Sequence, residues 1–194
     1  IIGLGTIGSY LYKYLEKNKA LLAKKTNVIP NISYVSAKNL TKKRNLKIPK
    51  KKWLKNYLDA TNKKDVDIII ELIGGAEGPA KKLVFDALNN GKHVVTANKA
   101  LIAKYGDELS YIAEKNRLNL EFEASVCGGI PIVRCIKEGL IANNINKIQG
   151  ILNGTSNYIL SSMDADKKSF KDSLIKAQSL GYAESNPSSD LNGN

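Results

Sequence analysis

The chain begins with Ile1-Ile2-Gly3-Leu4-Gly5-Thr6-Ile7-Gly8, and this stretch decides the fold. Its glycines follow the spacing G-x-G-x-x-G at Gly3, Gly5 and Gly8. Gly3 permits a tight turn after a strand, Gly5 lets a pyrophosphate approach the backbone, and Gly8 lets the next helix pack closely. The phosphates would face unpaired N–H groups at the start of that helix, expected over residues 7–18. The stretch predicts a dinucleotide site, with a purely structural turn as the alternative.

Apolar segments alternate with amphipathic segments along the following hundred or so residues. The expected strands lie at 32–37, 66–73, 93–97 and 118–126, and the expected helices at 79–90 and 100–116. This alternation predicts an α/β fold, a doubly wound parallel sheet of the Rossmann-like type. Ligands of such sheets bind beyond the carboxyl ends of the strands. Gly74 and Thr96 fall at those ends, which makes them candidates for the cofactor site. Lys99 also follows a strand end, where a surface lysine is the ordinary interpretation.

The pattern changes at Gly128-Gly129-Ile130-Pro131. A helix is expected to about Ile141, then a strand at 147–153, a helix from Ser156 capped by Thr155, and a helix at 170–180. We therefore expect a nucleotide-binding domain at 1–127 and the first part of an α+β substrate or dimerisation domain at 128–194. Because only two residues precede Gly3 and the chain ends in a polar run, we expect a fragment truncated at both ends.

Composition narrows the class of protein. Hydrophobic residues make up 43% of the 194, an ordinary value for a globular protein. No apolar run approaches the ~20 residues that span a bilayer, so we expect no membrane partner. Two cysteines, Cys127 and Cys135, are too few for a disulfide framework. That usage favours a reducing compartment, and we expect a cytoplasmic protein.

Positive charge is concentrated in one segment. The net charge is +12, and no acidic residue occurs between Lys17 and Leu58. Such a surface could attract nucleic acid or anionic small molecules. Aromatic residues are not interleaved with the cations as in a single-strand binder. Trp53 and Tyr57 instead have the spacing of one helix face. We therefore expect no nucleic-acid partner, and a solvated lysine-rich surface is the simplest interpretation.

The end of the second expected strand bears on the choice of cofactor. NAD-specific folds usually place an acid there to bind the ribose 2′-hydroxyl. Here Ser36, Ala37, Lys38 and Asn39 are followed by cations at 42–44. Cations could hold a 2′-phosphate instead. The segment predicts NADP, with NAD possible, and names Lys38 as a cofactor-binding candidate.

Six stretches, in this order, together resemble homoserine dehydrogenase of the monofunctional bacterial type. They are Gly3–Gly8, Glu71–Gly75, Thr96–Leu101, Phe122–Val126 with Gly128–Pro131, Gly150–Leu160, and Leu180–Glu184. The resemblance covers nearly the whole chain and is weakest at 18–62. It implies an NAD(P)-dependent oxidoreductase that reversibly reduces L-aspartate 4-semialdehyde to L-homoserine, in threonine and methionine biosynthesis.

The resemblance also assigns roles to individual residues. The cofactor-binding positions it implies are Gly3, Gly5, Thr6, Ile7, Gly8, Lys99 and Gly181. The substrate-binding positions are Glu184 for the ammonium group, Asp190, Tyr182 and Thr155. The family's general acid is a lysine beyond Asn194, so no catalytic residue can be named within this chain. A general acid contributes about 10²–10⁴-fold, and the chain alone should therefore be nearly inactive.

The resemblance further implies a monovalent cation, usually sodium. Its ligands would be the carboxylate of Glu123 and the carbonyl groups of Val126, Gly128 and Ile130. Oxygen ligands suit a hard cation. Family members are dimers or tetramers, so a homo-oligomer is expected.

Two alternatives remain open. Cys127 stands beside two glycines and could be a nucleophile, but that chemistry needs a basic partner. The single histidine, His93, begins a strand at the wrong end and is expected to be structural. The second alternative is a non-catalytic NADP-binding regulatory module, which would keep Gly3–Gly8 but lack the downstream lysine.

Overall fold

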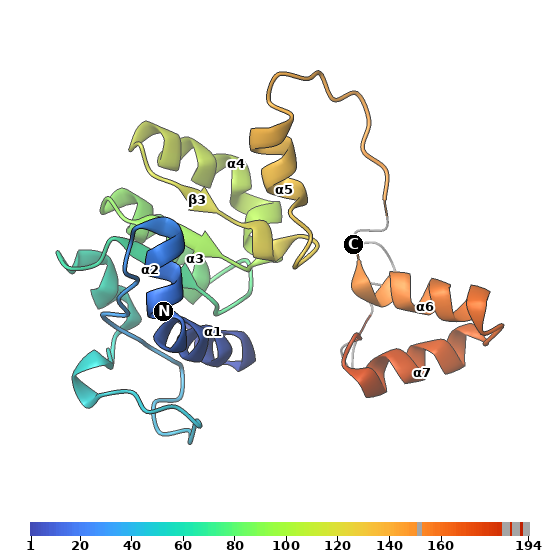
Figure 1. The fold of residues 1–194 in the computed structure, drawn as a ribbon, viewed down its shortest axis with the longest axis horizontal. Helices are drawn as coiled ribbons and strands as arrows, with labels where there is room; N and C mark the ends of the chain where they lie inside the picture. The colour runs from blue at the N-terminus through green and yellow to red at the C-terminus, as the bar shows by residue number, and fades with distance from the viewer. Residues whose placement is uncertain (151–152, 184–186, 188–190, 192–194) are drawn as a thin grey trace. The chain divides into compact units, whose positions relative to one another are not determined.

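The computed structural model describes residues 1–150, 153–183, 187 and 191. The chain divides into two compact units, Ile1–Val126 and Cys127–Asn194, each described here by itself. Figure 1 shows that the labelled strands lie in the first unit, where they alternate with helices along the chain. No helix in the described part of the chain is both long and apolar enough to cross a membrane.

The first unit is built on a parallel sheet. Its regular strands are β1 (Ile68–Glu71), β2 (His93–Thr96) and β3 (Leu120–Glu121), in the order β1-β2-β3. Ile69 pairs with Val94, and Val94 pairs with Leu120. The connections are α3 (Pro79–Asn89) and α4 (Lys99–Lys115). This βαβαβ unit confirms the expected α/β class.

Isolated β-bridges add three further chain segments to the three regular strands, so that six segments lie side by side in the sheet. Ile2 bridges both Glu71 and Ser36, and Val35 bridges Trp53, all in parallel. Backbone bonds from Ile2 N to Ile70 O (2.8 Å) and from Gly3 N to Ser36 O (2.9 Å) support these bridges. Numbered along the chain, the spatial order is therefore 3-2-1-4-5-6, the order of doubly wound dinucleotide-binding sheets. The topological switch point lies between Ile2 and β1.

Apolar residues cover the two faces of this sheet. Ile2, Ile69 and Val94 pack with the buried sides of α3 and α4 in one cluster. Leu4 and Val35 pack in a second cluster with Tyr12 of α1 (Thr6–Lys17). Neighbours such as Ile1 and Ile2 belong to different clusters, because side chains alternate across a strand. Helices therefore pack on both faces.

Several predicted elements differ from those observed. The predicted strand at 32–37 is reduced to bridges at Val35 and Ser36, and the one at 118–126 to β3 followed by η3 (Glu123–Ser125). Trp53 lies in the sheet and Tyr57 begins η2 (Tyr57–Asn62), so the prediction that they share a helix face was wrong. The remaining short elements are α2 (Lys19–Thr26) and η1 (Lys50–Lys52).

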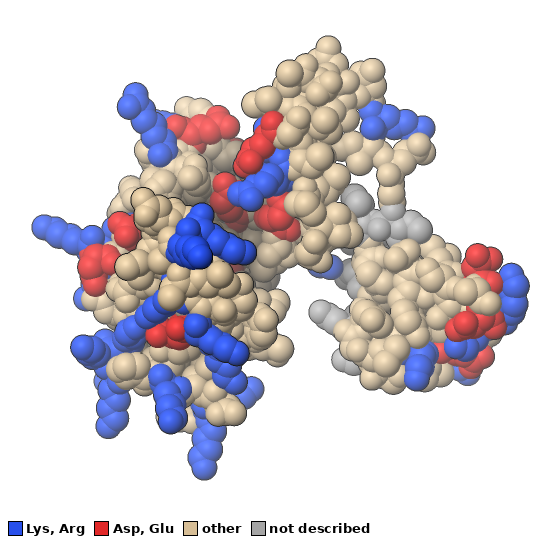
Figure 2. Space-filling view, in the orientation of Figure 1, with Lys and Arg blue, Asp and Glu red and all other residues tan. Residues whose placement is uncertain are grey.

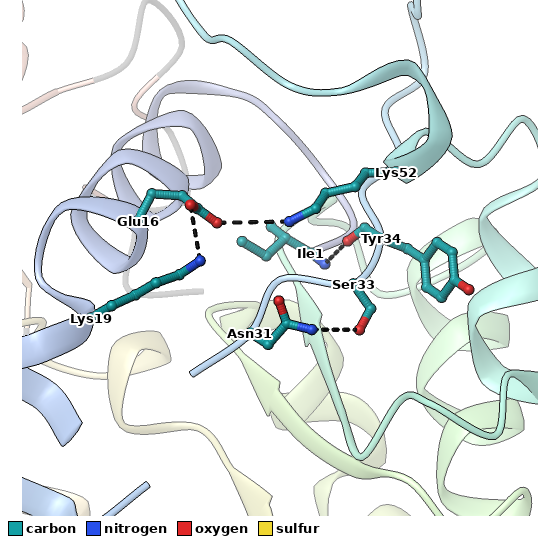
Figure 3. A network of polar contacts seen from close by, with 7 residues as sticks. All are labelled: Ile1, Glu16, Lys19, Asn31, Ser33, Tyr34 and Lys52. Carbon is teal, nitrogen blue, oxygen red and sulfur yellow. Dashed lines mark hydrogen bonds and ion pairs between the residues drawn. The ribbon is translucent and has the colours of Figure 1, made fainter. Parts of the chain in front are cut away.

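The amino-terminal edge of the sheet carries a small polar network, shown in Figure 3. Glu16 of α1 pairs with Lys19 at 3.0 Å and with Lys52 at 3.8 Å, and the Ile1 amino group donates to Tyr34 O at 2.9 Å. A cavity of about 220 Å³ borders Ile1 and β1, and Ile68 is 53% exposed. Strand β1 is therefore open to solvent at Ile68.

The second unit contains two helices of similar length that share a small core of their own. They are α6 (Gly154–Ala165) and α7 (Phe170–Leu180), and Ile159, Ala177 and Ala183 form the buried cluster. The α6 cap is Asn153, whose side chain accepts from Ser156 N at 2.8 Å, so the prediction of Thr155 as the cap was wrong.

The start of the second unit is less regular than predicted. The helix expected to about Ile141 appears as α5 (Ile132–Arg134) continued by the π-helical turn η4 (Cys135–Gly139). Residues 147–150 form no strand, and the rest of the strand predicted there, 151–152, lies outside the described residues.

Candidate dinucleotide site

The glycine turn lies at the switch point and is shaped by close backbone contacts. Gly3 has φ +104°, and a Cβ atom there would lie 2.3 Å from Leu72 O. A Cβ atom on Gly8 would lie 2.0 Å from Gly3 O. At Gly5 a Cβ atom would meet nothing within 4 Å. Gly3 and Gly8 are thus required by the fold, whereas Gly5 leaves its side of the turn open.

Helix α1 starts at this turn without a side-chain cap. Gly5 occupies the cap position, and the first turn holds no acidic residue. The first N–H groups of an α-helix have no partner within the helix. Thr6 and Ile7 are exposed there. The arrangement suits an anionic group placed over the helix start, as a pyrophosphate would be.

A cation is anchored directly to the glycine turn. Arg44 Nε donates to Leu4 O at 2.9 Å, and Nη1 donates to Lys42 O at 3.1 Å. The guanidinium also lies over the Trp53 ring, 5.8 Å from its centroid. Lys38, the residue named from the sequence, is exposed after the Val35–Ser36 segment. Figure 2 shows lysine and arginine side chains projecting around this part of the first unit. The structure thus places Arg44 against the glycine turn.

Across the switch point, the loop after β1 is held by a buried carboxylate. Glu71 is fully buried and accepts from Ile73 N at 2.6 Å and from Gly74 N at 3.0 Å. Thr96 Oγ1 donates to the other carboxylate oxygen at 2.5 Å. Thr96, predicted to bind the cofactor, therefore uses its hydroxyl within the protein. Sequence reasoning assigned no role to Glu71, although an acid inside the apolar run 68–73 was a usable signal.

Lys99 and the glycines of the same edge lie close in sequence to this carboxylate network. Gly74 and Gly75 both have φ +84°, a conformation that favours glycine. Lys99 is the first residue of α4 and is exposed. Asn98 caps α4 by accepting from Leu101 N at 3.1 Å. The carboxyl ends of β1 and β2 thus present a glycine loop and a lysine at the ligand-binding edge.

An ion cluster fixes the far end of the same loop. Glu77 accepts from Lys104 at 2.7 Å and from the Tyr105 hydroxyl, and Lys81 lies 3.7 Å away. The Lys104 hydrogen bond, with that of Tyr105, holds the pKa of the Glu77 carboxyl well below its usual range, at about 2. Residues 74–78 are therefore tied to α3 and α4.

The predicted cation ligands fall in both units. Glu123 and Val126 end the first unit, and Gly128 and Ile130 begin the second. Cys127 has φ +48° and Gly129 φ +89°, and Cys127 O accepts from Ile130 N at 2.8 Å. Carboxylate and carbonyl oxygens are the kind of ligand that a hard monovalent cation prefers. Among the described residues, no three His, Cys, Asp or Glu side chains are grouped as a metal site.

In the second unit, two predicted substrate residues contact each other. Thr155 is buried, and its hydroxyl donates to Tyr182 O at 2.6 Å. The Tyr182 ring stacks on Tyr158 with centroids 5.0 Å apart. Gly181 ends α7 with φ +79°. Glu184 and Asp190 lie outside the described residues.

The structure gives His93 a structural role. His93 begins β2, and its Nδ1 accepts from Asn119 N at 2.9 Å, as expected for a residue at the end of the strand away from the ligand edge. Since this ring nitrogen is already engaged, His93 offers little to a thiol mechanism at Cys127.

Comparisons with known proteins agree with this geometry. The family model "Homoserine dehydrogenase, NAD binding domain" matches residues 3–123, and the model "Homoserine dehydrogenase" matches residues 131–194. The homoserine dehydrogenase of Bacillus subtilis is 44% identical over 193 residues, and that of Neisseria gonorrhoeae is 43% identical over 194. Each alignment covers 100% of this chain and 44% of the relative, so the chain spans less than half of their length.

Solved structures show the same relationship. A homoserine dehydrogenase from Thiobacillus denitrificans superimposes with a TM-score of 0.85 at 41% identity, covering 97% of this chain and 43% of that one. A hyperthermophilic archaeal homoserine dehydrogenase in complex with NADPH gives a TM-score of 0.76 at 25% identity, covering 99% and 63%. Because one family model matches more than half of the chain, this chain belongs to the homoserine dehydrogenase family.

Proposed function

We propose that the protein containing this chain catalyses the reversible NAD(P)H-dependent reduction of L-aspartate 4-semialdehyde to L-homoserine, a step toward threonine and methionine. The observation that carries the proposal is the glycine turn at the switch point of a 3-2-1-4-5-6 sheet. The loop after β1 faces this turn, and Lys99 starts the next helix along the edge. A bound nicotinamide would supply the hydride for the aldehyde carbon, and the carbonyl oxygen would take a proton.

An assay of the full-length protein tests this function. NADPH oxidation is followed at 340 nm with aspartate 4-semialdehyde, and the reverse reaction with homoserine and NADP. Turnover in both directions is expected, together with little activity from residues 1–194 alone. Reading the source coding sequence beyond Asn194 separates the enzyme from a regulatory module. An open frame that lacks the downstream lysine favours the module and contradicts catalysis.

We propose NADP as the preferred cofactor. Arg44 places a guanidinium against the glycine turn, and no acid follows the Val35–Ser36 segment until Asp59. The dissociation constants of NADPH and NADH provide the test, and Arg44→Ala should reduce their ratio by roughly tenfold, the effect of one charge-assisted contact. The ratio cancels any general loosening of the turn. Lys64→Ala removes the same charge near the start of β1 and should leave the ratio unchanged. Equal affinities in the wild type contradict the preference.

We propose that a monovalent cation, sodium in the first instance, is held by Glu123 and the carbonyl groups of Val126, Gly128 and Ile130. The chemistry of these donors supports the proposal. Thermal unfolding in sodium chloride against tetramethylammonium chloride tests it. Sodium should raise the melting temperature of the wild type but not of Glu123→Gln. An identical sodium effect on both proteins contradicts the assignment.

For the substrate we propose Tyr182, Thr155, Glu184 and Asp190, with Glu184 receiving the ammonium group. The 2.6 Å bond from Thr155 to Tyr182 O supports a role for Thr155 in holding this segment. Glu184→Gln in the full-length protein should raise KM for homoserine and leave NADP binding unchanged. We also propose a cytoplasmic homo-oligomer, for which light scattering and cell fractionation are the tests.

A further inference from the structure

The carboxylate of Glu71 is the centre of a closed polar network. Its side chain is fully buried at the carboxyl end of β1. One oxygen accepts from Ile73 N and Gly74 N, and the other accepts from Thr96 Oγ1. A buried carboxylate is costly unless donors satisfy it. Here the donors are two loop amides and one hydroxyl from the neighbouring strand.

The network continues to a second element. Thr96 Oγ1 accepts from Asn98 N at 3.0 Å. The side-chain amide of Asn98 in turn makes one hydrogen bond as a donor and one as an acceptor. Its Nδ2 donates to Gly75 O at 2.7 Å, and its Oδ1 accepts from Leu101 N as the cap of α4. A path of hydrogen bonds therefore runs from Glu71 through Thr96 and Asn98 back to the loop that Glu71 holds.

Two parts of the ligand-binding edge depend on this path. The loop 72–75 faces the glycine turn, since Leu72 O lies where a Cβ of Gly3 would be. The first turn of α4 begins with Lys99, directly after Asn98. Neither part is fixed by apolar packing alone, because Ile73, Gly74, Gly75 and Lys99 are all exposed.

We propose that Glu71, with Thr96 and Asn98, forms a positioning network that sets the loop 72–75 and the start of α4 against the reacting end of the bound nucleotide. The inference rests on the proposed function and deepens it. All three side chains are buried, and they hydrogen-bond to one another and to the backbone of the loop and of α4. Loss of the network changes the alignment of hydride donor and acceptor, while the glycine turn and Arg44 still bind the nucleotide.

The sharpest test removes one hydroxyl in the full-length protein. Thr96→Val keeps the shape of the side chain but withdraws the donor to Glu71 and the acceptor for Asn98 N. Thr96→Ser keeps the hydroxyl and is the conservative rescue. Thr61→Val is the matched control, because Thr61 is also buried and donates to Leu58 O at 2.9 Å, away from the ligand edge. A fourth variant, Asn98→Ser, keeps a capping hydroxyl but loses the donor to Gly75 O.

The readouts separate positioning from folding. NADPH titration counts the sites that still bind, and kcat is expressed per bound nucleotide. Thr96→Val and Asn98→Ser should lower this kcat by on the order of 10- to 100-fold, the usual effect of a small misalignment. The NADPH dissociation constant should stay unchanged. The isotope effect with NADPH deuterated at the transferred position should rise, because hydride transfer becomes slower. Thr96→Ser should recover kcat relative to Thr96→Val, and Thr61→Val should match the wild type.

Each outcome has a defined meaning. If Thr96→Val and Asn98→Ser keep the wild-type kcat per bound nucleotide and the wild-type isotope effect, the positioning role is overturned. If Thr96→Val does not fold, Asn98→Ser alone decides by the same readouts. A wild-type protein without turnover overturns the proposed function and this inference together, and that failure is visible before any substitution is made.

Discussion

At the scale of single residues, the glycine turn separates requirements of the fold from requirements of the ligand. Gly8→Ala should destabilise the protein by about 1–3 kcal/mol or more, because its Cβ would overlap Gly3 O. Gly5→Ala meets no neighbour and should change the unfolding free energy by less than about 1 kcal/mol. If the pyrophosphate approaches the turn at Gly5, as we propose, the added methyl group should lower NADPH affinity on the order of tenfold. Denaturant unfolding and NADPH titration of both variants check this; equal stability losses would contradict it.

Glu77 provides a pH-dependent prediction at the same scale. Its pKa in the folded protein is about 2, lowered chiefly by the hydrogen bond from Lys104. A carboxyl with a depressed pKa stabilises the fold above its unfolded pKa, and the contribution is lost as pH falls through the folded value. Wild type should therefore lose more stability than Glu77→Gln between about pH 4.5 and 2. Thermal melts across that range test this. Because Glu77 is exposed, the difference should shrink in high salt.

At the scale of elements, the cap of α6 is a clear target. Asn153→Ala removes the acceptor for Ser156 N and should cost about 1 kcal/mol. Ser169→Ala removes the equivalent cap of α7, which accepts from Asp172 N at 3.1 Å, and should cost a similar amount. Urea unfolding of each variant measures these costs. An unchanged midpoint for Asn153→Ala would show that packing within the second unit, and not the cap, fixes where α6 begins.

Elements with local signals were predictable, and those fixed by distant contacts were not. Pro79 at the start of α3 and Gly181 after α7 are local signals, and these helices lie close to their predicted ranges. The sequence of segment 32–37 predicts a strand, but only Val35 and Ser36 make β-bridges. The partner of Val35 is Trp53, which lies later in the chain. The candidate site shows the same division between local and distant signals. The glycine spacing predicted the turn, whereas the contacts of Arg44 and Glu71 depend on which backbone groups the fold places beside them.

At the scale of the whole molecule, the two-unit division predicts independent folding of the first unit. Both apolar clusters of the sheet lie within Ile1–Val126. A chain ending at Val126 should therefore show cooperative unfolding and still bind NADPH through the glycine turn. Circular dichroism and nucleotide titration of the two chains check this. Weaker binding by the shorter chain would show that residues after Val126 contribute to the nucleotide site.

The outer limit of the sheet has a consequence for behaviour at high concentration. The last position, at Trp53, is a single bridging residue, with Lys50–Lys52 before it and Lys55 after it. Exposed strand edges recruit other chains into intermolecular sheets unless they are short or charged. This edge is both short and flanked by charge, so we expect these lysines to oppose pairing with another chain. The positive charge of this segment would then have a second consequence besides attracting a phosphate, since it would keep concentrated molecules apart at this edge.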